Sequence, residues 1–136
     1  MMAAAVEAAR DGAVDTPPCL VGVTVLTSVD EKTLAHQLGI KESASEHALR
    51  LARLAMDADL DGVVCSPHEV AMLRKELGHE AILVAPGIRA ADAELHDQKR
   101  TGTGGDALSA GANYIVVGRA LTAAADPERA LSALGL

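Results

Sequence analysis

The chain has almost no aromatic residues: it contains no Phe or Trp, and Tyr114 is its only Tyr. Its hydrophobic residues make up 49% of the 136 and are mostly Ala, Val and Leu. Small and branched side chains of this kind suit helices packed against buried parallel strands. A chain of this length can bury one core, so we expect a single domain over residues 1–136.

Positive charge is also scarce, with 12 Lys and Arg against 19 Asp and Glu and a formal net charge of −7. Nucleic acids and acidic membranes are bound by clusters of Lys and Arg, so this balance argues against both partners. No apolar run approaches the ~20 residues of a membrane helix, and no basic region precedes an apolar stretch at the N-terminus. We therefore expect a cytoplasmic protein in which any anion site is local.

Residues that commonly carry catalysis or hold metals form no motif. Cys19 and Cys65 are far apart without a CxxC pattern, which predicts buried, reduced thiols. Histidines without metal-ligand spacing are expected on the solvated surface, namely His36, His47, His79 and His96. We find no nucleophile–base pair and no strand with closely spaced Asp and Lys. The residues alone therefore predict no catalytic group and no metal ligand.

The chain does contain a regular alternation of helical and extended apolar segments. Continuous apolar runs predict strands at residues 20–26, 61–65, 81–85 and 113–117. Helical patterns lie at residues 1–10, after Ser43, after Ser66, from Thr103 to Ala110 and after Asp126, with a polar connection through Lys41. Strands that alternate with helices in this way predict a parallel sheet and an α/β fold.

Capping residues mark several of these helix starts. Ser43 with Glu46, and Ser66 with Glu69, have the spacing of capping boxes. The helix at Thr103 opens instead within Thr-Gly-Thr-Gly-Gly at 101–105. Each Gly costs up to about 1 kcal/mol in a helix, so we expect this segment to be loose.

Candidate binding residues follow the predicted strands, where parallel α/β folds place their chemistry. Gly118 and Arg119 follow the last strand, and a short helix is predicted near Ala120. Backbone N–H groups at a glycine and a guanidinium fork together form a phosphate site. The alternatives are that Arg119 pairs with a surface carboxylate and that Gly118 is a turn glycine.

Three further residues each allow a ligand-binding interpretation and a structural one. Arg89 could bind the same anion or pair with the loop at Asp97. Gln98 offers a donor and an acceptor, so it can link a base edge to a phosphate, or it is an ordinary loop residue. Thr27 could bond a pyrimidine or cap a turn or helix.

Motifs in a fixed order carry a family resemblance. They are Val-Thr-Val-Leu-Thr-Ser at 23–28, Asp-Gly-Val-Val-Cys-Ser at 61–66, Pro-Gly-Ile-Arg at 86–89, Asp-Gln-Lys-Arg at 97–100 and Val-Val-Gly-Arg at 116–119. Together they resemble orotidine 5′-phosphate decarboxylase. The resemblance implies a (β/α)8 TIM barrel, usually a homodimer, that converts orotidine monophosphate to UMP and CO2 without a cofactor or metal.

The same resemblance assigns roles by position. Thr27 would contact the pyrimidine, Gln98 would bridge base and phosphate, Gly118 and Arg119 would hold the phosphate, and Arg89 falls on a substrate-binding position. The family's catalytic Asp and Lys network lies on early strands, which would precede Met1. We therefore expect the C-terminal half of the barrel, with about four parallel strands, and no catalytic residue in this chain.

Half a barrel leaves strand edges unpaired. The chain is therefore expected to form a homodimer or to pair with a complementary half-barrel. Two other functions stay open: a non-catalytic phosphate-ligand or oligomerisation module, and another phosphate-handling barrel enzyme such as a relative of ribulose-phosphate epimerase. Thr27 and the motif at 97–100 favour the decarboxylase over the epimerase relative.

Overall fold

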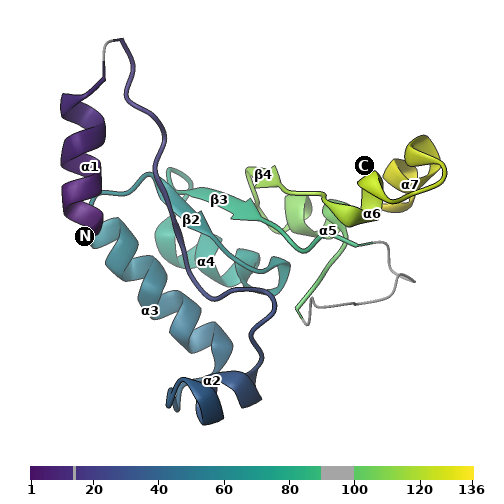
Figure 1. Ribbon diagram of the computed structural model, residues 1–136, viewed down its shortest axis with the longest axis horizontal. Helices are drawn as coiled ribbons and strands as arrows, with labels where there is room; N and C mark the ends of the chain where they lie inside the picture. The colour runs from purple at the N-terminus through teal and green to yellow at the C-terminus, as the bar shows by residue number, and fades with distance from the viewer. Residues whose placement is uncertain (14, 90–99) are drawn as a thin grey trace.

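The computed structural model describes residues 1–13, 15–89 and 100–136 (Figure 1). Within these residues four strands form one sheet, in the order β1-β2-β3-β4, and every neighbouring pair is parallel. The strands are β1 (Val21–Val23), β2 (Gly62–Val64), β3 (Ile82–Ala85) and β4 (Tyr114–Ile115). Each strand pairs with the next one in the chain, so the predicted α/β alternation of helices and parallel strands is confirmed.

Helices connect the strands and flank the sheet. They are α1 (Met2–Asp11), α2 (Glu31–Gln37), α3 (Ala44–Asp57), the 3-10 turn η1 (Pro67–Glu69), α4 (Val70–Leu77), α5 (Gly104–Ser109), α6 (Arg119–Thr122) and α7 (Pro127–Ala133). Figure 1 shows α1 at one end of the molecule and α6 with α7 at the other. None of the helices in the described part of the chain combines the length and apolarity needed to cross a membrane.

The predicted capping boxes are present at both helix starts. The Ser43 hydroxyl accepts from the backbone N–H of Glu46, whose carboxylate accepts in return from the Ser43 N–H. Ser66 and Glu69 form the second box around Pro67, although the first turn is 3-10 before it continues as α4. Both boxes could be predicted from the sequence because capping depends only on residues within one helical turn.

The polar connection through Lys41, for which no helix was predicted, contains α2. Asp30 caps this helix by accepting from the N–H of Thr33 at 2.8 Å. Leu34 is 1% exposed and packs with Val25, Ala44 and Ala48 in a small apolar cluster. One buried residue on a seven-residue helix leaves no periodic pattern in the sequence.

The two faces of the sheet differ in burial. We call the side of Val63, Cys65, Leu83 and Ala85 the closed face, because these side chains are at most 1% exposed in the main core. Helices α3 and α4 contact the strands, α3 at β1 and β2 and α4 at β3. The open face is the cross-strand row of alternating residues Val23, Val64, Val84 and Tyr114. At its two ends Val23 is 59% and Tyr114 62% exposed.

One glycine is required where the central strands meet. A Cβ built on Gly62 would lie 1.9 Å from the carbonyl oxygen of Ile82 on the neighbouring strand. Real Cβ atoms do not approach backbone this closely, so only glycine allows β2 and β3 to pair in this register.

Arg74 of α4 holds the amino-terminal side of the sheet together. Its guanidinium donates to the carbonyl oxygens of Ala81 and Gly111 at 2.8 Å, and to Asn113 Oδ1 at 2.6 Å. The same Asn113 oxygen accepts from the N–H of Leu83. Arg74 thereby fixes the start of β3 and the turn before β4.

Candidate functional site

The predicted site residues lie beyond the carboxyl ends of the strands. Thr27 follows β1, Arg89 follows β3, and Gly118 with Arg119 follows β4. Since β1 and β4 are the outer strands, the segments that carry Thr27 and Gly118 follow opposite sides of the sheet, three interstrand steps apart along it. This edge would suit an elongated ligand. Gln98 lies outside the described residues.

Gly118 and Arg119 form the start of α6. The carbonyl oxygen of Gly118 accepts from the N–H groups of Leu121 and Thr122, at 2.9 and 3.1 Å. Among the described residues, a Cβ on Gly118 would meet no atom within 4 Å, so they leave space beside this backbone. Helix α6 has only four residues, which limits its dipole, and the exposed Arg119 adds a positive charge at its start.

Arg89 is buried, with 7% of the residue exposed. Its Nη1 donates to the carbonyl oxygen of Ile88 at 3.2 Å, while its buried Nε has no hydrogen-bond partner within the described residues. A buried guanidinium with unused donors is costly, and a bound anion would lower that cost. Asp97, the alternative partner expected from the sequence, is also outside the described residues.

Thr27 is 8% exposed and faces a small cavity. The cavity has a volume of about 50 Å³, and its lining includes Thr27, Leu26, Cys65 and Pro86. Sites for small molecules are usually ~300–1,000 Å³. This cavity is therefore too small to be a complete small-molecule site, and we call its lining the candidate ligand wall.

A buried ion pair lies beside this wall, between Glu69 of η1 and Arg100. The carboxylate of Glu69 also accepts from the N–H of Ser66 at 2.9 Å. Glu69 is 1% exposed, and burial raises the pKa of its carboxyl group, while the Arg100 charge opposes that rise. The sequence identified Glu69 only as a capping residue and Arg100 only as part of a motif, because nothing local links residues so far apart.

Cys65 lies on the closed face directly before Ser66. Burial raises the pKa of its thiol to about 12, with the nearby charge of Glu69 adding to the effect. A thiol with this pKa is protonated at neutral pH and is a poor nucleophile. Cys65 is therefore a packing residue, as expected, whereas the prediction that Cys19 is buried is wrong.

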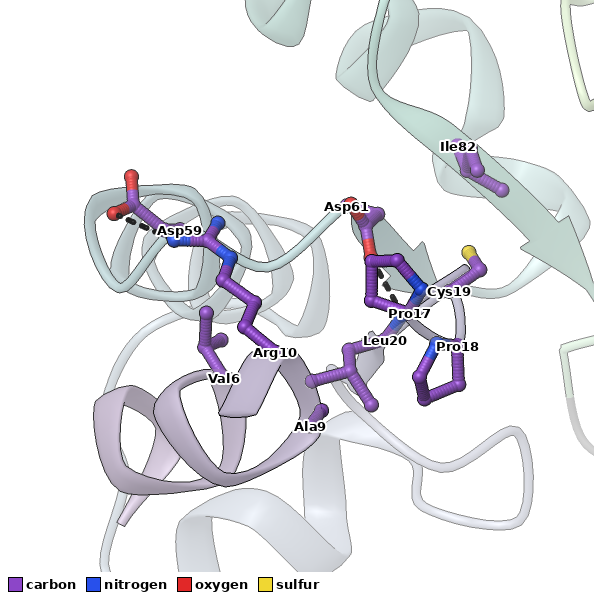
Figure 2. Close-up of a pocket in the computed structure, with 10 residues that line it drawn as sticks. All are labelled: Val6, Ala9, Arg10, Pro17, Pro18, Cys19, Leu20, Asp59, Asp61 and Ile82. Atoms are coloured by element: carbon purple, nitrogen blue, oxygen red, sulfur yellow. Dashed lines mark hydrogen bonds and ion pairs between the residues drawn. The ribbon is translucent and has the colours of Figure 1, made fainter. Parts of the chain in front are cut away.

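A second pocket lies near the amino ends of the strands, between α1 and the segment before β1 (Figure 2). It has a volume of about 190 Å³ and contains the carboxylates of Asp59 and Asp61. Asp61 accepts from the N–H of Leu20 at 2.6 Å, and Arg10 lies 4.0 Å from Asp59. The carboxylates make this pocket unsuited to an anion. The exposed Cys19 is part of its wall.

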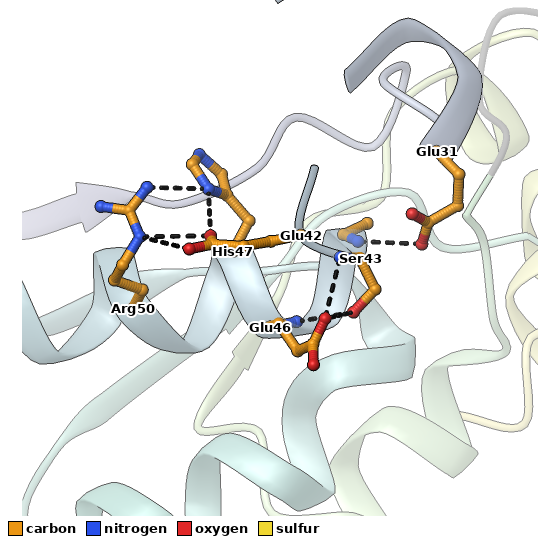
Figure 3. A network of polar contacts seen from close by, with 7 residues as sticks. Glu31, Glu42, Ser43, Glu46, His47 and Arg50 are labelled. Atoms are coloured by element: carbon orange, nitrogen blue, oxygen red, sulfur yellow. Dashed lines mark hydrogen bonds and ion pairs between the residues drawn. The ribbon is translucent and has the colours of Figure 1, made fainter. Parts of the chain in front are cut away.

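The amino end of α3 carries a polar network that the sequence did not predict (Figure 3). His47, expected on the solvated surface, is 8% exposed and its Nδ1 lies 2.9 Å from Glu42 Oε2. Hydrogen bonds from His47 and then Arg50 lower the pKa of Glu42. Glu31 accepts from the Ala44 N–H at 2.8 Å. Carboxylates thus occupy this helix start, which removes it as a phosphate site.

The described residues contain no group of three or more His, Cys, Asp or Glu side chains that could hold a metal ion. They also contain one Asp-x-Lys sequence, Asp30-Glu31-Lys32, at the start of α2. Asp30 is the capping residue there, and Lys32 is exposed on the helix. The described strands themselves contain no charged residue.

These features define a class: an α/β protein with four parallel strands of the (β/α)8 barrel type, and polar residues at the strand carboxyl ends. The family profile described as "Orotidine 5'-phosphate decarboxylase / HUMPS family" matches residues 1–134. The chain belongs to this family, which confirms the resemblance seen in its motifs.

Curated relatives are similar across most of the chain. An orotidine 5′-phosphate decarboxylase of Nostoc sp. is 49% identical over 130 residues, which cover 93% of this chain and 55% of the relative. One of Pseudoalteromonas atlantica is 50% identical over 119 residues, covering 88% of this chain and 51% of the relative. The chain thus spans about half the length of the curated relatives it matches.

Solved structures give the same relation. Orotidine 5′-phosphate decarboxylase from Lactobacillus acidophilus matches with a TM-score of 0.78 and 34% identity, over 99% of this chain and 56% of that one. An uncharacterized conserved protein from Geobacillus kaustophilus matches with a TM-score of 0.75 and 36% identity, over the same shares. The four-stranded fold is therefore half of a barrel, as the sequence predicted.

Proposed function

We propose that this chain supplies base- and phosphate-holding residues of an orotidine 5′-phosphate decarboxylase, the lyase that forms UMP and CO2 in pyrimidine biosynthesis. We further propose that it does not turn over substrate alone and that it acts in the cytoplasm. The observation that carries the proposal is family membership over residues 1–134, with four of the predicted site residues following the carboxyl ends of parallel strands.

The phosphate would bind where β4 ends. The open space beside Gly118 lets a phosphate oxygen approach backbone N–H groups, and Arg119 adds a guanidinium that can donate twice to one phosphate. Arg89 supports the same site because its buried Nε lacks a hydrogen-bond acceptor among the described residues. The resulting interaction is local, in agreement with the overall negative charge.

The pyrimidine would bind on the β1 side. Thr27 presents a hydroxyl beside the small cavity, and a hydroxyl can donate to or accept from an imide edge. We assign Gln98 the bridging role between base and phosphate that the family resemblance implies. A nucleotide would then span the sheet, with its base near Thr27 after β1 and its phosphate near Gly118 after β4.

Binding by itself does not accelerate decarboxylation. Loss of CO2 leaves an electron pair on the ring carbon, so a catalyst must place positive charge or a proton donor at that carbon. Interactions raise the rate only if they are stronger in the transition state than with substrate. The described strands carry no charged residue for this task, and the resemblance assigns it to the early strands of the family's barrel.

A second candidate is a non-catalytic oligomerisation module. It is favoured by the open face, where Val23 and Tyr114 are more than half exposed. An exposed apolar row beside unpaired strand edges supports association with a second copy or with a complementary half-barrel. Sedimentation measurements over a range of concentrations would show a dimer, or a monomer that dimerises only with such a partner.

The deciding experiment is calorimetric titration of the full chain with UMP and with 6-azauridine monophosphate, together with a decarboxylation assay. Arg119→Ala should weaken binding about 10- to 100-fold, the loss expected for charge-assisted hydrogen bonds. Arg53→Ala is the matched control, because Arg53 pairs with Glu76 on the exposed helical side.

Saturable binding that is lost in Arg119→Ala, retained in Arg53→Ala and not accompanied by turnover would support the proposal. Turnover by the wild-type chain would refute the claim that it is inactive alone. Absence of binding to either nucleotide would refute the retained binding site and leave the oligomerisation module as the better function.

A further inference from the structure

Arg100 connects two segments that end neighbouring strands. Its Nη2 donates to the carbonyl oxygens of Val25 and Leu26, at 3.0 and 3.2 Å, directly after β1. Its Nη1 pairs with Glu69, which follows β2. The Arg100 side chain is 13% exposed and that of Glu69 is 1% exposed, so water competes little for these contacts.

The pair is tied to the backbone on both sides. Glu69 accepts from the N–H of Ser66, and the hydroxyl of Ser66 donates to the carbonyl oxygen of Arg100 at 3.4 Å. Ser66 is itself fully buried. The position of Arg100 is therefore determined through its side chain and its main chain, which makes it a rigid anchor for whatever it contacts.

Arg100 contacts backbone in the candidate ligand wall, at Val25 and Leu26. The Leu26 carbonyl immediately precedes Thr27, and it also accepts from the N–H of Val29 at 2.9 Å. On the other side of Arg100, Gly102 bridges to Ile88 and accepts from the N–H of Arg89 at 3.0 Å. One ion pair thus borders the segments of two predicted binding residues, Thr27 and Arg89.

We propose that Glu69 and Arg100 are positioning residues for nucleotide binding: they hold the backbone at 25–27 so that Thr27 faces the base. This inference rests on the proposed function for the identity of the ligand. Neither residue needs to touch the nucleotide. Their effect is expected on the base side, because the Arg100 guanidinium bonds the Val25 and Leu26 carbonyl oxygens directly. Arg89 is held instead by a backbone bond to Gly102, and Gly118 and Arg119 lie on the opposite outer strand.

The geometry requires arginine and not merely a positive charge. The guanidinium directs Nη1 to Glu69 and Nη2 to the two carbonyl oxygens at the same time. A lysine keeps the charge beside Glu69 but replaces the planar fork with a single ammonium group. Arg100→Lys should therefore preserve folding while releasing the segment at 25–27, which separates positioning from stability.

The test compares two probes, UMP and ribose 5-phosphate, on the full chain. The wild-type chain should bind UMP more tightly, and Arg100→Lys should lower that preference about tenfold, as expected for the loss of one well-placed hydrogen bond. Its affinity for ribose 5-phosphate should stay unchanged. Arg53→Lys, in the exposed pair with Glu76, is the matched control and should change neither affinity.

Equal weakening of both probes in Arg100→Lys would overturn the proposal in favour of a general structural role. An unchanged preference for UMP would overturn it directly.

Hydrogen exchange supplies a readout that does not depend on a ligand. The N–H of Val29, bonded to the Leu26 carbonyl, should exchange faster in Arg100→Lys than in the wild type or in Arg53→Lys. If the wild-type chain binds neither probe, the proposed function fails, and faster exchange at Val29 still supports the positioning of this segment. Unchanged exchange would refute it with or without binding.

Discussion

The closed and open faces of the sheet are built from similar residues but have opposite surroundings. Val63 and Leu83 on the closed face are fully buried, whereas Val23 and Tyr114 on the open face are more than half exposed. Apolar residues on both faces are typical of parallel strands covered on each side. The difference shows that the strands have the composition of a sheet covered on both faces, while the described residues fully bury only one of them.

The two faces should therefore contribute unequally to stability. A side chain removed from water stabilises the fold in proportion to the apolar area it buries. Closed-face residues already bury that area within the chain, whereas those at the ends of the open-face row gain little until another surface covers them. Mutations at alternating positions of one strand can measure this directly.

The largest effect is expected for Leu83→Ala on β3. Leu83 is fully buried in the main core, so its truncation should lower the free energy of unfolding by about 2–5 kcal/mol. Val84→Ala, the neighbouring position on the open face, should cost at most about 1 kcal/mol. Denaturant unfolding of both variants checks the contrast, and equal losses would contradict the difference between the faces.

A smaller, pH-dependent effect is expected for Glu69→Gln. Burial raises the pKa of Glu69 in the folded chain, while Arg100 lowers it and Glu31 adds to the rise. The unfolded chain releases this proton near the ordinary value of 4.5, and the folded chain retains it to higher pH. Between those two values the folded state binds more protons, so rising pH destabilises the wild-type fold.

The measurement is the free energy of unfolding of both chains from pH 4 to pH 7, in steps and at constant ionic strength. The wild type should lose stability relative to Glu69→Gln as the pH rises through the folded-state pKa of Glu69. A relative gain for the wild type over this range would mean that the ion pair with Arg100 outweighs the cost of burying the carboxylate.

The smallest effect on stability is expected for Tyr114→Thr at the outer end of the open face. Tyr114 is 62% exposed, and threonine is favourable in strands, so the free energy of unfolding should change by no more than about 0.5 kcal/mol. Self-association should decrease instead, which sedimentation at several concentrations can detect. A large loss of stability would show that Tyr114 already packs within the chain.

The sequence predicted those features that depend on neighbouring residues. Both capping boxes and the alternation of apolar runs with helices were readable within a few residues of chain. The runs overestimated the strands, however: residues 20–26 were expected, and only Val21–Val23 form β1. The apolar run extends beyond β1 because Val25, which lies outside the sheet, packs against Leu34.

Features that depend on distant partners could not be predicted in this way. His47 is buried and its Nδ1 contacts the side chains of Glu42 and Arg50. Arg100 pairs with Glu69, from which it is separated in the chain by β3. The candidate site shows the same limit. The motifs predicted Thr27, Arg89, Gln98, Gly118 and Arg119, and these assignments stay predictions, whereas the ion pair beside Thr27 gave no local signal.

The glycines at the start of α5 illustrate how tertiary contact changes a local argument. Propensity alone predicted a loose segment there, since glycine weakens a helix. In the structure the N–H groups of Gly104 and Gly105 donate to the carbonyl oxygen of Leu134, and a Cβ on Gly105 would lie 2.9 Å from the Gly135 oxygen. Glycine here permits the close approach of α5 and the C-terminal turn.

The order of the strands in the sheet also bears on how the protein is made. Because β1 pairs with β2, β2 with β3 and β3 with β4, the strands β2, β3 and β4 each pair with the strand synthesised before them. Chains emerge from the ribosome N-terminus first, and contacts between neighbouring segments form faster than distant ones. We therefore expect the sheet to grow by one strand and helix at a time during translation, with a single advancing edge.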